Sequence, residues 1–209
     1  MEVELKYLIE DEETQKKLWN ESVFKKYGDV DPRGETNMRA VYYDTRDGLL
    51  HSVDAAFRIR KENERLVATL KWGGRNQNEL SEREELNIPL CGLSDAEKPT
   101  LKVFAESKKG RELIELVGDR ELVPVVETSF TRKTMRIDTG KSICEAALDT
   151  GKIITAGGNA DIRELELELF SGSVEDLEEI GSDIAERFSL RAGVKSKYAR
   201  GIELRQKSV

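Results

Sequence analysis

Charged and aliphatic residues alternate strictly in two segments of the chain. Glu164-Leu165-Glu166-Leu167-Glu168-Leu169 places carboxylates on the even positions and leucines on the odd ones. The opening segment, Glu2-Val3-Glu4-Leu5-Lys6, likewise has charged residues on the even positions and aliphatic residues on the odd ones. Alternate residues of a β-strand share a face, about 7 Å apart along it, so each segment predicts a strand with one charged face and one face that packs.

The alternation recurs along the chain with a change of sign. Phe57-Arg58-Ile59-Arg60 puts two arginines on one face, and the strand expected over 66–72 adds Lys71. Segments 83–88, 132–137 and 143–150 show the same two-faced pattern. A merely solvated sheet face would mix positive and negative charges within each strand. The separation of acidic strands from basic ones therefore favours a common charged site.

Apolar residues at helical spacing predict helices that could cover one side of the sheet. We expect a helix over 11–26, two short helices over 94–118, and a helix that begins after Ser173 with a capping-box spacing to Asp176. Asp31-Pro32-Arg33-Gly34 is expected to form a turn between the first helix and the second strand.

Helices on the apolar side of a curved sheet would turn the charged faces toward its concave side. The concave side would then hold Glu2, Glu4, Lys6, Arg58, Arg60, Lys71, Arg83, Glu85, Arg132, Glu145, Asp149, Glu164 and Glu166. A dry core of that kind is disfavoured because each buried ion costs several kcal/mol, and replacing a buried ion pair by apolar residues is often stabilising by ~1 to 4 kcal/mol. The interior is therefore expected to hold water and a ligand. An open antiparallel sheet with a solvated polar face is the alternative.

The residue types on this concave side predict the ligand. Crowded carboxylates stay ionised near neutral pH when a hard divalent cation lies among them, and Mg²⁺ or Mn²⁺ prefers such oxygen ligands. Clustered arginines and lysines suit phosphate oxygens. Together they predict a polyphosphate site, and hydrolysis there requires no histidine or nucleophilic serine because positioning and charge neutralisation suffice.

Composition excludes several other classes of protein. The 209 residues include 41 acidic and 34 basic ones, and the net charge of -7 argues against a general nucleic-acid or anionic-membrane surface. No apolar run approaches the ~20 residues that span a bilayer, and the charged N-terminus is not a signal peptide, so a cytoplasmic protein is expected. Cys91 and Cys144 are expected to be small buried hydrophobes, and His51 a surface or loop residue without a chemical role. No long linker divides the chain, which predicts one α+β domain over residues 1–209.

Glu2-x-Glu4-x-Lys6 resembles the ExExK signature of the CYTH domain, the family of triphosphate tunnel metalloenzymes. Other matching segments follow in the order of the family: Tyr42-Tyr43-Asp44-Thr45, Arg58-Ile59-Arg60, Leu70-Lys71, Arg83-Glu84-Glu85, Arg132, Glu145 through Asp149, Glu164-Leu165-Glu166, and Lys195. ExExK alone is a weak signal, whereas the ordered set covers nearly the whole chain. The resemblance implies a closed tunnel of eight antiparallel strands with a charged lumen and surrounding helices, acting on triphosphates with Mg²⁺ or Mn²⁺.

The resemblance also implies a role for each matching residue. Metal ions would be held by Glu2, Glu4, Asp149, Glu164 and Glu166, and one of these ions would activate the attacking water. Phosphates would be held by Lys6, Arg58, Arg60, Lys71, Arg83, Arg132 and Lys195. Glu85 and Glu145 would complete the tunnel wall or orient cations and water, next to Glu2, Glu4 and Lys6 in the catalytic centre. Arg136, Glu168, Lys197 and Glu84 could each be exposed without consequence.

Within the family, the segments 83–90, 130–133 and 164–172 look most like the bacterial inorganic triphosphatases. Many of those carry a helical CHAD domain that this sequence lacks, so a stand-alone or shortened form is expected. The expected reaction converts inorganic triphosphate to pyrophosphate and phosphate. The alternatives are a class IV adenylyl cyclase, a thiamine or nucleoside triphosphatase, and a binding module for polyphosphate without catalysis. The expected partner is a small-molecule triphosphate, with no nucleic acid or membrane and a possible homodimer.

Overall fold

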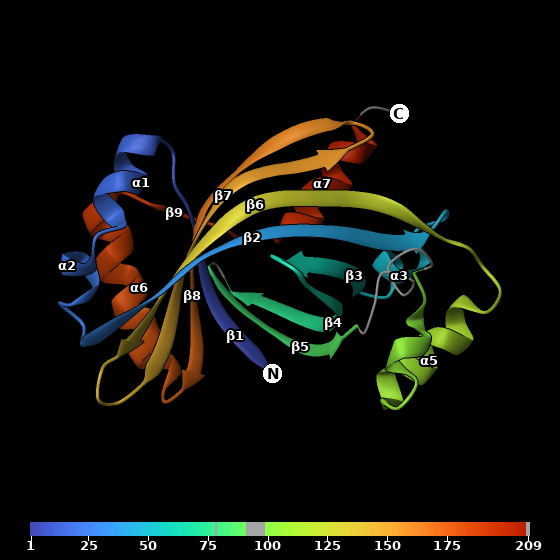
Figure 1. The fold of residues 1–209 in the computed structure, drawn as a ribbon, viewed down its shortest axis with the longest axis horizontal. Coiled ribbons are helices and arrows are strands. Elements are labelled where there is room, and N and C mark those ends of the chain that lie inside the picture. The colour runs from blue at the N-terminus through green and yellow to red at the C-terminus, as the bar shows by residue number, and fades with distance from the viewer. Residues whose placement is uncertain (78, 91–98, 208–209) are drawn as a thin grey trace.

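Eight strands close into an antiparallel barrel in the computed structural model, which describes residues 1–77, 79–90 and 99–207 (Figure 1). The barrel strands are β1 (Glu2–Leu8), β2 (Asp29–Thr45), β3 (Ala55–Glu62), β4 (Arg65–Gln77), β5 (Leu80–Pro89), β6 (Leu122–Asp138), β7 (Ile143–Thr155) and β8 (Gly158–Ser171). A short additional strand, β9 (Arg191–Ala192), pairs with β1. The strands are ordered β5-β4-β3-β2-β6-β7-β8-β1-β9, and β1 also pairs with β5. This second pairing closes the ring and confirms the predicted fold, so the open-sheet alternative is wrong.

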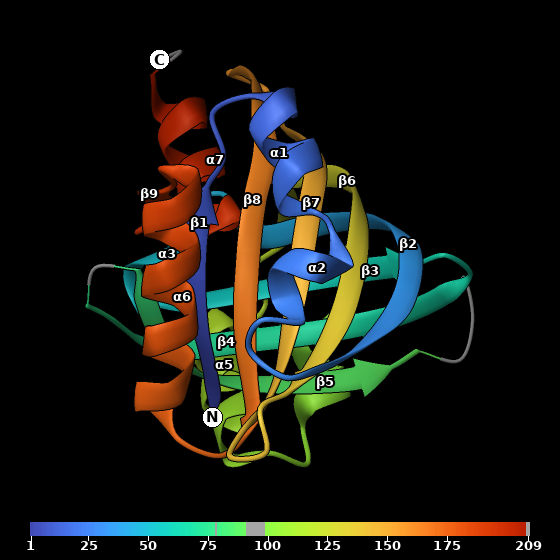
Figure 2. The same ribbon diagram turned by 90° about the vertical axis from the view of Figure 1, so that its left-hand side faces the viewer.

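Three helices cover the outer face of β1 and the strands next to it. They are α1 (Glu12–Leu18), α2 (Glu21–Phe24) and α6 (Val174–Phe188), and Figure 2 shows them on one side of the barrel. Leu5 and Tyr7 of β1 point outward and are buried in a core with Leu177 and Ile184 of α6. The odd positions of β1 therefore pack against helices, which leaves its even positions for the lumen.

A second outer core lies on β3 and β4. The short α3 (Leu49–Ser52), the 3₁₀ helix η1 (Leu101–Phe104) and α5 (Lys108–Val117) pack there. Phe57 is buried against Phe104, with ring centroids 5.9 Å apart. Of the region expected to form two short helices, residues 94–98 lie outside the described part of the chain, as does Cys91. Cys144 is buried, as expected.

The last helix, α7 (Lys197–Gln206), lies on the inner face of the sheet. Its Tyr198 and Ile202 pack with Ile153 and Ile162, which share the inward-facing positions of β7 and β8 with the lumen carboxylates. A Cβ at Gly201 would clash with the Val126 side chain, so the helix approaches β6 closely. One end of the barrel is thus filled by α7, and the lumen occupies the remainder.

Two local predictions were wrong. The helix expected over 11–26 is broken into α1 and α2, because Asn20 caps α2 by accepting a hydrogen bond from the backbone N–H of Ser22 at 3.0 Å. The turn expected at 31–34 lies within β2, where the register against β6 shifts between Pro32 and Gly34. His51 lies in α3 and is exposed. None of the helices in the described residues is both long and apolar enough to cross a membrane.

Candidate active site

A polar cavity of about 550 Å³ occupies the lumen. It is lined by inward-facing residues of all eight barrel strands, because alternate positions of each strand point to the same face. The predicted site residues that line it are Glu2, Glu4, Lys6, Arg58, Arg60, Lys71, Arg83, Glu85, Arg132, Glu145 and Glu166. The structure thus brings most of the predicted set together around one cavity.

Three glutamates stand side by side on neighbouring strands at one wall of this cavity. Glu4 of β1 is directly opposite Glu168 of β8, and Glu168 is directly opposite Glu145 of β7. All three line the cavity. Like charges in directly opposite positions destabilise a sheet by up to about 1 kcal/mol per pair. The row therefore concentrates negative charge that a cation in the lumen would relieve.

Two lysines contact Glu4 and the carboxylates near this row, Glu2 and Glu85. Lys6 Nζ lies 2.8 Å from Glu4 Oε1, and Lys71 Nζ lies 2.6 Å from Glu2 Oε2 and 2.5 Å from Glu85 Oε2. Burial raises the pKa of Glu2 more than Lys71 lowers it. Although burial acts in the opposite direction, Lys71 and Arg58 lower the pKa of Glu85 to about 2. Glu85 is therefore ionised at neutral pH.

The central glutamate of the row is the least easily ionised. Burial, together with the charges of Glu2 and Glu4, raises the pKa of Glu168 to about 7. Lys71 lowers this pKa too little to compensate. The neighbouring carboxylates thus repel the charge of Glu168, which takes up a proton near neutral pH.

Arginines form the opposite wall. β3 lies four strands away from β8 in the ring, so Arg58 and Arg60 face the acidic row across the lumen. Arg58 Nη1 donates to Tyr42 Oη at 3.1 Å, and Arg60 pairs with Glu62. Within the described residues, the buried Nε atoms of Arg58, Arg60 and Arg83 have no hydrogen-bond partner. Burial and the neighbouring Arg58 lower the pKa of Arg60 to about 10, which indicates cations in excess of their local counter-ions.

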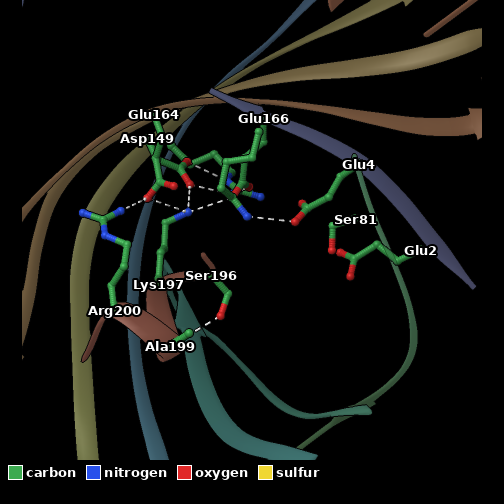
Figure 3. Close-up of polar contacts among 12 residues, drawn as sticks. Glu2, Glu4, Ser81, Asp149, Glu164, Glu166, Ser196, Lys197, Ala199 and Arg200 are labelled. Atoms are coloured by element: carbon green, nitrogen blue, oxygen red, sulfur yellow. Dashed lines mark hydrogen bonds and ion pairs between the residues drawn. The ribbon is translucent and has the colours of Figure 1, made fainter. Parts of the chain in front are cut away.

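Asp149 and Glu164, which the sequence predicted as metal ligands, do not line this cavity. Both are fully buried and are held by cations, as Figure 3 shows. Lys197 Nζ lies 2.7 Å from Asp149 Oδ2 and 3.3 Å from Glu164 Oε1. Arg132 makes a two-point contact with Asp149 at 2.7 and 2.6 Å, and Arg200 Nη1 lies 3.1 Å from Glu164 Oε1. Both oxygens of Asp149 and Oε1 of Glu164 thus contact protein cations at the end of the lumen that α7 fills, whereas the buried Oε2 of Glu164 has no hydrogen-bond partner in the described residues.

Glu166 joins this buried cluster to the cavity. Its Oε1 lies 2.9 Å from Lys197 Nζ and 3.1 Å from Lys6 Nζ, and its other oxygen contacts Arg132. Although burial acts in the opposite direction, Lys197, Lys6 and Arg132 hold the pKa of Glu166 well below its usual range. Glu166 is therefore ionised and fixes both Lys6 and Arg132 at the cavity wall.

Sequence reasoning assigned the wrong surroundings to two lysines of the C-terminal region. Lys195, predicted to hold phosphate, is outside the main cavity and pairs with Glu203 at 2.6 Å. Lys197, treated as dispensable, is buried with three carboxylate partners. Sequence reasoning also missed Tyr42 and Glu168 as lining residues. The alternation through Glu168 could have identified that residue, whereas no strand period applies to Lys197 because it begins a helix.

Comparison with known proteins identifies the family of the chain. The sequence model of the CYTH domain matches residues 1–202. The chain belongs to the CYTH domain family. An inorganic triphosphatase from Haemophilus influenzae is 32% identical to it over 166 residues, which are 79% of this chain and 45% of that protein. The chain therefore spans about half the length of this curated relative.

Solved structures share the CYTH fold. A Hippeastrum protein described as a putative adenylyl cyclase with a dominant triphosphatase activity aligns with a TM-score of 0.72 at 19% identity, covering 98% of this chain and 97% of that one. A putative adenylate cyclase from Bacillus halodurans aligns with a TM-score of 0.59 at 20% identity, covering 96% of each chain. At these identities the likeness shows the fold alone.

The donor set of this CYTH lumen fits a hard divalent cation. In the described parts of the chain, no three Asp, Glu, His or Cys side chains are gathered as a ready metal cluster. The carboxylates of Glu2 and Glu4 instead contact lysines. The row of Glu4, Glu168 and Glu145 offers carboxylate oxygens on three neighbouring strands, and such oxygens are the ligands that Mg²⁺ and Mn²⁺ prefer.

Proposed function

We propose that the chain hydrolyses inorganic triphosphate to pyrophosphate and phosphate with the help of Mg²⁺ or Mn²⁺. The observation that carries this proposal is the division of the lumen into two walls. Glutamates on β1, β8 and β7 face arginines on β3 across a cavity of about 550 Å³. A site for anions alone would not be lined with carboxylates, and a site for cations alone would not be lined with buried guanidinium groups that have free donors. A triphosphate with its metal requires both.

The cationic side chains of the lumen would bind and orient the phosphate chain, Arg58 and Arg60 from β3 and Arg83 from β5 next to β1. Arg58, Arg60 and Arg83 each keep a buried N–H donor available, and a guanidinium can make two-point contacts with phosphate oxygens. Lys6 and Lys71 also line the cavity and add positive charge beside it while they remain paired with carboxylates. The contact between Arg58 and Tyr42 Oη fixes the guanidinium before substrate arrives. Pre-organised charge of this kind is the main contribution that a protein makes to phosphoryl transfer.

The acidic wall would hold the metal and position water. Glu4, Glu168 and Glu145 would supply the oxygen ligands, with Glu2 and Glu166 next to them. A divalent cation bound there supplies charge neutralisation and lowers the pKa of a coordinated water. Asp149 and Glu164 would act from outside the cavity by holding Arg132 and Lys197 in place. The metal ligands proposed from the structure therefore lie toward the open end of the lumen, away from α7, and no longer include Asp149 and Glu164.

Phosphate release from inorganic triphosphate, measured with Mg²⁺ and with Mn²⁺, tests the proposal. We expect Glu4→Gln and Arg58→Ala to lower kcat/KM at least a hundredfold while the circular dichroism spectrum stays unchanged. Arg39→Ala is the matched control, since Arg39 is 67% exposed and pairs with Glu127 away from the lumen cavity. Full activity in either lumen variant would refute the site. Formation of cyclic AMP from ATP in the same assay would favour the cyclase alternative.

A further inference from the structure

The guanidinium of Arg58 is oriented by a tyrosine and not by a carboxylate. Tyr42 of β2 is directly opposite Arg58 of β3, and Arg58 Nη1 donates to Tyr42 Oη at 3.1 Å. The Cζ atom of Arg58 also lies 5.8 Å from the centroid of the Tyr42 ring. Arg132, by contrast, contacts the carboxylates of Asp149 and Glu166, whereas Arg58 forms no ion pair with another described residue. The position of the Tyr42 ring therefore sets the direction in which Arg58 presents its donors to the lumen.

The Tyr42 ring is in turn held by Tyr198 of α7. The two rings are stacked, with centroids 5.1 Å apart and an angle of 24° between their planes. Both side chains are buried. Stacked aromatic rings attract each other beyond the apolar area that they bury, so each ring restricts the motion of the other. A residue of the last helix thus fixes a group that contacts an arginine of the lumen.

The ring of Tyr198 is itself fixed by two further residues. His51 of α3 meets it edge to face, with ring centroids 5.9 Å apart. Its hydroxyl group donates a long hydrogen bond of 3.4 Å to Asp44 Oδ2. Asp44 is buried and accepts hydrogen bonds from the backbone N–H groups of Leu50 at 2.8 Å and His51 at 3.0 Å. Strand β2 and helices α3 and α7 therefore meet around this ring.

An ordinary core residue would explain the burial of Tyr198 but not its position. Ile202 lies one turn further along α7 and packs in the same inner core. Tyr198 differs from it by lining the lumen cavity and by stacking on the residue that contacts Arg58. A small displacement of a positioned binding group can cost roughly a hundredfold in rate, even when the replaced residue lies away from the chemistry. Loss of the Tyr198 ring should therefore affect activity more than its contribution to stability explains.

We propose that Tyr198 is a positioning residue for Arg58, acting through the stacked ring of Tyr42. The inference rests on the proposed function, because it takes Arg58 to bind the phosphate chain. It gives α7 a second role: the helix fills one end of the barrel and also fixes the direction of an arginine on β3.

The test separates the flat ring of Tyr198 from its apolar bulk. Tyr198→Leu and Tyr198→Met keep an apolar side chain on α7 but lose the ring, whereas Tyr198→Phe loses only the hydroxyl group. Ile202→Ala is the matched control, since both residues are 8% exposed and Ile202 does not line the lumen cavity. The readouts are kcat/KM for inorganic triphosphate and the urea midpoint of unfolding.

We expect Tyr198→Leu and Tyr198→Met to lower kcat/KM roughly tenfold or more, and Tyr198→Phe to stay within about threefold of the wild type. Ile202→Ala should lower the urea midpoint and leave kcat/KM within about threefold. Full activity in either variant that lacks the ring would overturn the proposal. So would an equal loss of activity in Tyr198→Phe or in Ile202→Ala, because the effect would then not belong to the ring.

A double-mutant cycle with Arg58→Ala tests the path from Tyr198 to the lumen. If Tyr198 acts through Arg58, adding Tyr198→Leu to the Arg58→Ala chain should lower kcat/KM by less than about threefold more. A further loss of roughly tenfold would mean that the two residues act independently. Tyr198 would then affect the substrate by another route, and the positioning role would be wrong.

Failure of the proposed function gives a different result. If the wild-type chain releases no phosphate from inorganic triphosphate with either metal, the hydrolysis proposal is wrong. The variants are then compared by calorimetric titration with inorganic triphosphate, which Tyr198→Leu should bind roughly tenfold more weakly than the wild type and Tyr198→Phe within about threefold of it. Equal binding by all three chains, or no binding by the wild type, would overturn the positioning role as well.

Discussion

Replacing Lys197 by methionine should destabilise the protein more than any other single lysine replacement in the C-terminal region. The Nζ atom of Lys197 lies within 2.7 to 3.3 Å of three carboxylates, those of Asp149, Glu164 and Glu166. Two of these carboxylates are fully buried. Removing one partner of a buried ion pair typically costs about 3 to 5 kcal/mol, because it leaves an uncompensated charge in the interior.

The expected change in melting temperature follows from the size of the chain. For domains of 150 to 250 residues, each kcal/mol shifts Tm by roughly 2 to 4 °C. Lys197→Met should therefore lower Tm by about 6 to 20 °C, measured by circular dichroism at pH 7.5 in the presence of EDTA. Lys195→Met is the matched control. Its side chain is 56% exposed with one partner, Glu203, so it should change stability by no more than about 0.5 kcal/mol.

A double variant identifies the cause of the loss. Glu164→Gln removes one of the three carboxylate charges that lose a cation in Lys197→Met, so it should destabilise the wild type but recover part of the stability of Lys197→Met. A coupling energy between about 0.5 and 3 kcal/mol is expected for residues in one network. If the Lys197 and Lys195 variants melt within about 2 °C of each other, the buried cluster does not stabilise the fold and the reasoning is refuted.

Two further predictions concern the lumen and the helix that fills it. The pKa of Glu168 is about 7 in the folded state and about 4.5 in the unfolded state, so the folded state binds the proton of Glu168 more tightly. The resulting stabilisation of the fold is fully present below pH 4.5 and is lost as the pH rises through 7. In EDTA the protein should thus lose about 1 to 3 kcal/mol between pH 5 and pH 8, after allowance for solvent screening, and Glu168→Gln should flatten this dependence in urea titrations. A Glu168→Gln variant with the wild-type slope would contradict the assignment. Gly201→Ala should destabilise by about 1 to 3 kcal/mol in the same urea titrations, because the added methyl group clashes with Val126 and displaces α7.

The strand faces could be predicted because a period of two identifies them without any tertiary information. Most strands that form the lumen alternate between a packed outer face and a charged inner face, whereas β2 contributes the uncharged Thr36, Met38 and Tyr42 to the lumen. The closed ring was implied by resemblance to the CYTH family rather than by the alternation, which is also compatible with an open sheet. The row formed by Glu4, Glu168 and Glu145 could not be predicted, because it depends on the register of β1, β8 and β7.

The position of α7 was the main feature that sequence could not supply. Its sequence shows where apolar residues are available but not that the helix enters the barrel. Lys195 and Lys197 are two residues apart and have the same chemistry. One precedes the helix and is exposed, whereas the other begins it and is buried. A resemblance transferred residue by residue therefore named Lys195 and not Lys197, although Lys197 is the lysine that lies at the end of the lumen.

The burial of α7 also explains how part of the interior can be charged despite the desolvation cost of burying ions. The charges next to α7 form a network in which Asp149, Glu164 and Glu166 contact Lys197, Arg132 or Arg200. Such a network is compatible with burial because each carboxylate has cationic partners. The charges toward the open end are matched less well: burial and neighbouring charges raise the pKa of Glu168 and lower that of Arg60. Unmatched charges of opposite sign on facing walls are stabilised best by a ligand that carries both signs, and a metal triphosphate is such a ligand.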